Sequence, residues 1–155
     1  MNPLKLRSIF QSCQLHASTM QNALMQLDQF DHPDWGNLTM EQRQILDQLA
    51  YRFGKLQDTL GMLLLPAICD LAGEAFPPNT PFAEKLQRLE RLTVIPSVNE
   101  WKTLRETRNT LAHEYPDDPQ LSAQLIQQFL TGTQHLLSIW QHIATHPLSQ
   151  SLRPL

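Results

Sequence analysis

The chain has 155 residues, a formal net charge of −3 and a pI near 6.0, which fits one compact domain with its own core. The negative balance argues against a broad basic face that neutralises many phosphates, but it leaves room for a small local cationic cleft. The two cysteines lack the spacing of metal ligands, no apolar run reaches about 18 residues, and the N-terminus lacks a secretion-signal pattern. We therefore expect a soluble, cytoplasmic protein without membrane contact, metal or cofactor.

The first half of the chain predicts two long helices. Apolar residues recur at spacings of three and four, as in helices, and period-2 alternation is nearly absent. A stripe of such residues predicts a first helix over about residues 4–30. Thr39 and Gln42 have the form of a capping box that starts the second helix. This helix should run to Pro66, whose ring would kink or end it, and residues 67–72 would extend the same direction.

Two shorter helices are predicted next. Pro81 suits the first position of a third helix, which ends near Pro96. Ser97 can cap a fourth helix. That helix must stop by about Glu114, because Pro116 disfavours helical geometry at the residue before it.

The last predicted helix begins at Asp118 and Pro119, which supply an N-cap and a first helical position, and ends near His146. Residues 1–147 then form a single domain, and residues 148–155 are expected to be a frayed C-terminal tail. Because the connections are short, we expect an all-α fold, an antiparallel up-and-down bundle of four to five helices.

The best candidate for chemistry is the end of the fourth predicted helix, where Arg108, His113 and Tyr115 lie within eight residues. A guanidinium binds phosphate oxygens, and an imidazole can take a proton from a ribose 2′-hydroxyl or give one to a leaving oxygen. On a regular helix Arg108 and His113 lie about 140° apart. They would meet only if the last turn is distorted or if a two-fold dimer brings two copies together.

The pattern Arg-Asn-x-x-x-His-x-Tyr, formed by Arg108, Asn109, His113 and Tyr115, resembles the R-x4-H motif and H-x-Y extension of HEPN domains. It is most similar to the HEPN toxins that are paired with minimal nucleotidyltransferase (MNT) antitoxins, and the resemblance covers about residues 40–143. It implies a helical bundle and a metal-independent endoribonuclease that acts as a homodimer on RNA. Arg108 and His113 would line a cleft between the two protomers, and Asn109 would help to shape it.

The same resemblance implies how the nuclease is silenced: the MNT antitoxin transfers AMP to Tyr115. The added negative charge would lie where an RNA phosphate should bind. From the sequence alone, a phenol packed over the turn is an equally good interpretation of Tyr115, and the two are compatible.

Other charged residues are candidates for a supporting role. Arg105 lies one turn before Arg108 and can add phosphate affinity. A second stretch that resembles the family, residues 52–61, contains Arg52 and Asp58 as possible contributors from the second helix. An ordinary charged helix face is the alternative for all three.

Two alternatives to the nuclease are open at this point. Arg108 and His113 also fit a surface arginine and a histidine that stabilises a helix C-terminus. The chain would then be a non-catalytic HEPN module that holds or presents a nucleotidyltransferase, or a structural helical protein without any link to nucleotides.

Overall fold

The computed structural model describes residues 2–73, 76–111 and 117–153, and within these ranges every element is helical and none is a strand. The elements are α1 (Pro3–Asp28), α2 (Met40–Thr59), the π-helical turn η1 (Leu60–Leu64), α3 (Leu65–Leu71), α4 (Phe82–Arg91), α5 (Val98–Leu111), α6 (Pro119–Thr145) and the 3₁₀-helix η2 (Pro147–Leu152). The predicted all-α class is confirmed.

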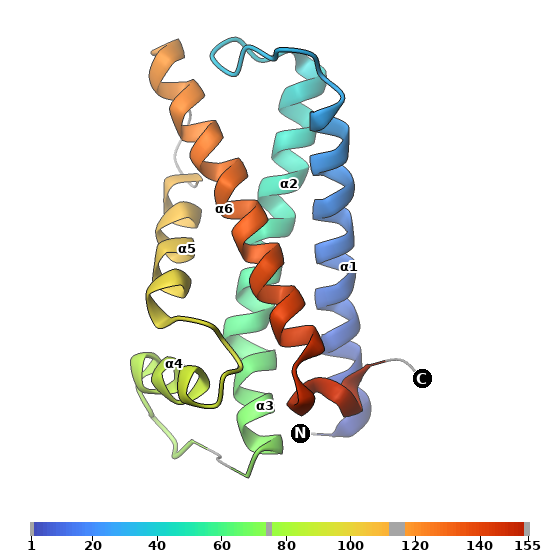
Figure 1. The fold of residues 1–155 in the computed structure, drawn as a ribbon, viewed down its shortest axis with the longest axis vertical. Helices are drawn as coiled ribbons and strands as arrows, with labels where there is room; N and C mark the ends of the chain where they lie inside the picture. The colour runs from blue at the N-terminus through green and yellow to red at the C-terminus, as the bar shows by residue number, and fades with distance from the viewer. Residues whose placement is uncertain (1, 74–75, 112–116, 154–155) are drawn as a thin grey trace.

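The long helices run alternately up and down (Figure 1). In this view α1 runs upward and is followed by α2, η1 and α3, which return as one continuous rod. The short α4 lies across the lower end, α5 runs upward again, and α6 returns between α5 and α1. Four antiparallel helices with a fifth, crosswise one agree with the predicted bundle of four to five helices.

Helix starts follow the predicted capping residues closely. The backbone N–H of Gln42 donates to Thr39 Oγ1 (3.1 Å), and the Thr39 N–H donates to Gln42 Oε1 (3.0 Å), which is a complete capping box. Asp118 Oδ1 likewise accepts the N–H of Gln120 (3.0 Å) at the start of α6. At α4 the prediction was off by one residue, because Pro81 is the N-cap and the helix begins at Phe82.

Pro66 does not end its helix, which continues beyond it in agreement with the expected extension over residues 67–72. A proline ring clashes with the carbonyl four residues earlier, here that of Met62, and removes one hydrogen bond. Met62 lies in the π-helical turn, where the Leu65 N–H reaches back five residues to the Leu60 carbonyl. The wider turn makes room for the ring, so the helix continues to Leu71.

The core lies between the long helices. Phe53 of α2 and Phe129 of α6 meet edge to face with ring centroids 5.7 Å apart, and both are buried. Gly132 of α6 brings α5 especially close, because a Cβ built there would lie 2.9 Å from Thr107 Cγ2. This contact fixes the distance of α5, the helix that carries Arg108, from the rest of the bundle.

The prediction of a frayed tail was wrong as far as residue 153. Residues 147–152 form η2, and Leu152 packs into the core at 4% exposure. The Arg153 guanidinium donates to the carbonyl oxygens of Ala144 (2.7 Å) and His146 (2.8 Å) at the end of α6. An apolar anchor and a C-terminal cap therefore order this segment. No helix in the described ranges is long and apolar enough to cross a membrane.

Candidate functional site

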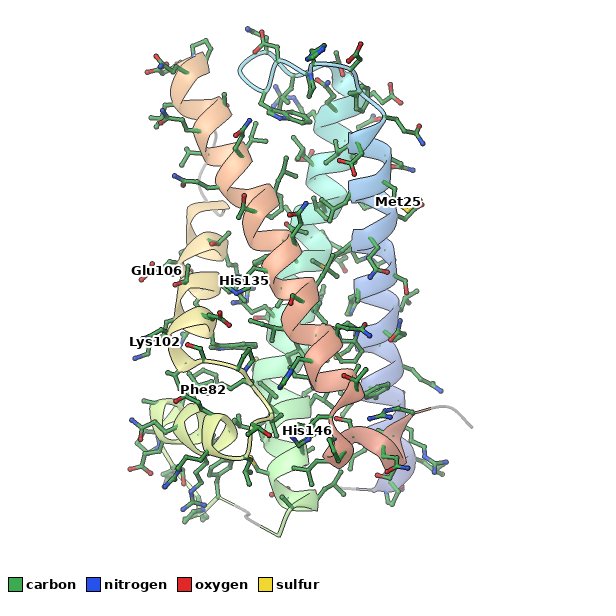
Figure 2. All side chains as sticks on the ribbon, viewed as in Figure 1. Met25, Phe82, Lys102, Glu106, His135 and His146 are labelled. Atoms are coloured by element: carbon green, nitrogen blue, oxygen red, sulfur yellow. The ribbon has the colours of Figure 1, made fainter. Side chains whose placement is uncertain are left out.

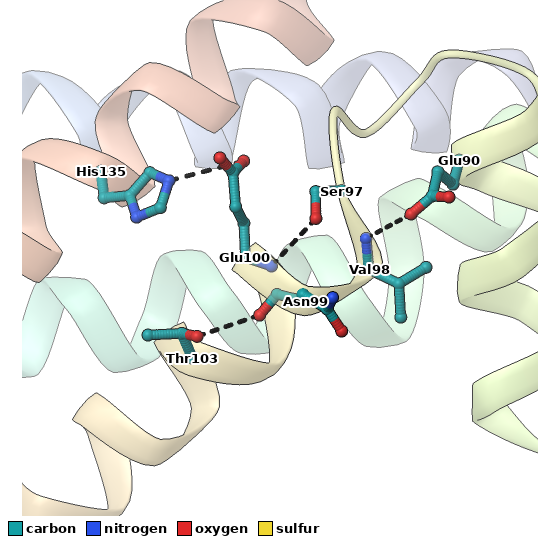
Figure 3. A network of polar contacts seen from close by, with 7 residues as sticks. All are labelled: Glu90, Ser97, Val98, Asn99, Glu100, Thr103 and His135. Carbon is teal, nitrogen blue, oxygen red and sulfur yellow. Dashed lines mark hydrogen bonds and ion pairs between the residues drawn. The ribbon is translucent and has the colours of Figure 1, made fainter.

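The N-terminal end of α5 is held by neighbours on both sides, and this fixes the side chains that follow (Figure 3). Ser97 Oγ caps the helix by accepting the N–H of Glu100 (3.3 Å), and Glu90 Oε2 of α4 accepts the N–H of Val98 (2.6 Å). The Glu100 carboxylate also lies 3.5 Å from His135 Nε2 on α6. The start of α5 is thus tied to both α4 and α6.

Arg108 reaches from α5 to α2, where its guanidinium pairs with both carboxylate oxygens of Asp58. Nη1 contacts Oδ1 and Nη2 donates to Oδ2 at 2.8 Å, a bidentate arrangement. The guanidinium also lies over Gly54, with its nearest atoms 3.7 Å from where a Cβ would be. The hydrogen bond that Arg108 donates to Asp58 raises the pKa of Arg108 further above its usual range. Both side chains keep over two fifths of their surface exposed (42% and 44%), so solvent and ligands can reach them.

Arg52, the other candidate on α2, points elsewhere. Its Nη1 donates to His16 Nδ1 on α1 at 3.0 Å. Residues 52 and 58 lie about 120° apart on a helix, so they face different neighbours. Burial, followed by the charges of Arg52 and Lys55, lowers the pKa of His16. Arg52 therefore belongs to the α1–α2 contact and does not join Arg108.

An open groove of about 730 Å³ lies beside the Arg108–Asp58 pair, between α2 with η1, α4 and α5. Its lining consists of Gln57, Asp58, Gly61, Met62, Pro66, Phe82, Lys85, Trp101, Arg105, Arg108 and Asn109. Three cations and one carboxylate give this lining a net charge of +2, whereas the whole chain carries −3. The local cationic cleft that the composition left open is present.

Aromatic rings stand among these charges. The guanidinium of Arg105 lies over the Phe82 ring, 5.4 Å from its centroid, which is a cation–π contact. Trp101 and Phe82 both pack against Gly61, where a Cβ would lie 3.3 Å from the indole and 3.6 Å from the phenyl ring. Phe82 extends from the start of α4 toward α5 (Figure 2). The groove thus combines cations with flat apolar surfaces.

The structure brings four of the predicted site residues together: Arg108, Asp58, Arg105 and Asn109 all line the groove. His113 and Tyr115 lie outside the described residues. Within those residues no group of three or more His, Cys, Asp or Glu side chains is arranged to hold a metal ion.

Sequence reasoning missed Gln57, Phe82, Lys85 and Trp101. The two aromatic residues carry the apolar pattern of a helix core, and Trp101 does belong to the core at 1% exposure. Gln57 carried a usable signal, because it is a polar residue one turn from Phe53 on the buried side of α2. Lys85 offered none, since α4 carries several cations and only tertiary packing selects the one that faces the groove.

Comparison with known proteins gives no family. No family model, curated protein or solved structure matches this chain. The resemblance to HEPN toxins therefore depends on the pattern at residues 108–115 and on the stretch 52–61.

Proposed function

We propose that this chain is a metal-independent endoribonuclease of the HEPN type, with Arg108 as the group that holds the scissile phosphate. The observation that carries the proposal is the groove. On a chain of net charge −3, three cations, two aromatic rings and the motif residues Arg108 and Asn109 line one open space. Cations bind the RNA backbone, and aromatic faces stack on unpaired bases.

The reaction that fits these groups is attack of a ribose 2′-hydroxyl on the adjacent phosphorus. The 2′-oxygen forms a bond to phosphorus while the bond to the 5′-oxygen breaks, giving a 2′,3′-cyclic phosphate and a free 5′-hydroxyl. A neutral His113 imidazole takes the 2′ proton, and a protonated His113 of the second protomer gives one to the leaving oxygen. The Arg108 guanidinium stabilises the charge that gathers on the phosphate oxygens.

This assignment also proposes the biological setting: a homodimer with a composite cleft, acting as the toxin of a toxin–antitoxin pair. An MNT nucleotidyltransferase would silence it by transferring AMP to Tyr115. The phosphate of the AMP group would bring negative charge next to the cations of the groove, where it competes with RNA. The support for this step is the Arg-Asn-x-x-x-His-x-Tyr pattern.

The test is cleavage of end-labelled RNA by the purified protein in the presence of a chelator, with Arg108→Ala and His113→Ala beside wild type. Lys102→Ala is the matched control. It removes a cation from the same helix, but Lys102 projects from the outer side of α5 and does not line the groove (Figure 2). We expect wild type and Lys102→Ala to leave 2′,3′-cyclic phosphate ends and the other two variants to leave RNA intact. A 2′-O-methyl RNA, which lacks the nucleophile, should resist all four proteins.

Growth after induced expression tests the toxin assignment separately. Wild type and Tyr115→Phe should arrest growth, whereas Arg108→Ala and His113→Ala should not. Coexpression of a cognate nucleotidyltransferase should rescue cells with wild type but not cells with Tyr115→Phe. Cleavage that persists in Arg108→Ala, with circular dichroism confirming the fold, would remove Arg108 from the mechanism.

One observation favours the second candidate, a non-catalytic partner module for a nucleotidyltransferase. Asp58 already binds Arg108 through both carboxylate oxygens, and this ties α2 to α5 without any RNA. On that account the protein binds a nucleotidyltransferase tightly, while purified protein cuts no RNA at any concentration and expression is harmless.

A further inference from the structure

A buried glutamine, Gln57, lines the groove. Gln57 is 4% exposed, and neither its amide oxygen nor its amide nitrogen has a hydrogen-bond partner among the described residues. The same holds for the indole N–H of Trp101, which lines the same groove. Buried polar atoms are nearly always paired, so one acceptor and two donor groups left unpaired in one groove require an explanation.

The position of Gln57 on α2 suggests the explanation. Residues 54, 57 and 61 share one helix face, because they are three and four positions apart. The Arg108 guanidinium lies over Gly54, and the rings of Trp101 and Phe82 lie over Gly61. Gln57 therefore stands between the cation that would hold a phosphate and the partly exposed Phe82 ring, on which a base would stack.

An amide offers an acceptor and a donor side by side, and this is the arrangement that pairs with the edge of a nucleobase. Glutamine pairs in this bidentate way with adenine in particular, and unpaired RNA bases are read by such contacts together with stacking. The groove, at about 730 Å³, has the size of a small-molecule site.

We propose that Gln57 is a specificity-determining residue that reads the edge of the nucleobase next to the phosphate held by Arg108, with adenine as the preferred base. The Trp101 N–H supplies a further donor to the same base. The inference rests on the proposed function in taking the ligand to be RNA. It adds that binding and cleavage depend on the base.

The amide also makes a prediction about stability. An unpaired buried amide destabilises the free protein, so Gln57→Met, which keeps the length and shape of the side chain, should raise Tm. Gln42 is the matched control, because it is equally buried on the same helix but has its hydrogen bonds to Thr39. Gln42→Met should lower Tm.

The experiment measures binding of the four ribonucleoside monophosphates and of ribose 5-phosphate to the full chain by isothermal titration. These probes contain no scissile linkage, so the readout does not depend on catalysis. We expect AMP to bind at least about tenfold more tightly than ribose 5-phosphate. Gln57→Met should lose this difference while its Tm rises, and Gln42→Met should keep it.

The outcomes separate this inference from the proposed function. If all four nucleotides bind no better than ribose 5-phosphate, or if Gln57→Met binds AMP like wild type, the inference is wrong even where RNA is cleaved. If AMP binding depends on Gln57 but no RNA is cleaved, the base-reading site stands and the nuclease proposal fails.

Discussion

The pair between Arg108 and Asp58 makes a prediction that needs no assumption about function. Both side chains are more than two fifths exposed, so solvent screens their attraction and an ordinary exposed pair would contribute little. The bidentate geometry places this pair at the upper end of the range for exposed pairs. We expect a coupling free energy of about 0.5–1 kcal/mol from a double-mutant cycle of Asp58→Asn and Arg108→Gln.

The assay is urea unfolding followed by circular dichroism at low salt and at 1 M salt. The free energy of unfolding falls by about 2 kcal/mol per M urea, so loss of the pair lowers the urea midpoint by roughly 0.25–0.5 M. At 1 M salt the Debye length is about 3 Å, so most of the coupling should disappear. Asp47→Asn is the control, because it makes the same charge change on an exposed residue of α2 about 16 Å along the helix.

The same variant tests the link between this pair and RNA. Asp58→Asn raises the net charge of the groove lining from +2 to +3 and frees Arg108 for a phosphate. Binding of uncleavable 2′-O-methyl RNA should tighten. The slope of the logarithm of the binding constant against the logarithm of the salt concentration should steepen by about 0.7. Zero coupling at low salt would refute the ion pair. Unchanged RNA affinity in Asp58→Asn, beside a normal coupling energy, would refute the placement of RNA at Arg108.

Three further predictions concern the bundle itself. Gly132→Ala should lower the free energy of unfolding by about 1–3 kcal/mol in urea titrations, because its Cβ would lie 2.9 Å from Thr107 Cγ2; Gly54→Ala, with ordinary 3.7 Å contacts, should instead raise it by about 0.5–1 kcal/mol. Burial raises the pKa of Cys13 to about 12, so iodoacetamide at pH 8 should label this thiol only after unfolding, and rapid labelling of the native protein would contradict its burial. Because the pKa of His16 is lowered in the folded protein, the unfolded chain takes up this proton at a higher pH than the folded chain does. Stability should therefore fall as pH drops below 6.5 and through the folded-state pKa. A His16→Gln variant with the same pH profile would disprove this.

Most of the fold was predictable because its signals are local. Thr39, Ser97 and Asp118 cap helices through their own side chains, so the sequence shows them without knowledge of the fold. The order of the tail was not predictable in this way, because Leu152 packs into the core and Arg153 reaches the carbonyls at the end of α6.

The residues of the candidate site likewise include some with a local sequence signal and some that only tertiary packing selects. Arg108, Asn109 and Arg105 are close in sequence and were found as a pattern, and the structure places all three at one groove. Helical spacing alone did not separate Asp58 from Arg52, because that choice depends on which neighbour faces each side of α2. Lys85 reaches the groove only because α4 crosses the end of the bundle (Figure 1).

The π-helical turn allows one continuous helix to serve two different neighbours. The π-helical turn accommodates one extra residue, and this rotates the side chains after it by about 100° relative to a regular α-helix. The buried face of α2 therefore packs against α1, whereas α3 turns a different face to α4. Met62, at 75% exposure, contributes little packing at this point. Its importance is that it belongs to the turn that holds one residue more than an α-helical turn. Deleting this residue would convert the turn to regular α-helix and keep Leu65 and Ile68 in the core, but it would restore the clash of the Pro66 ring with the backbone carbonyl four residues earlier.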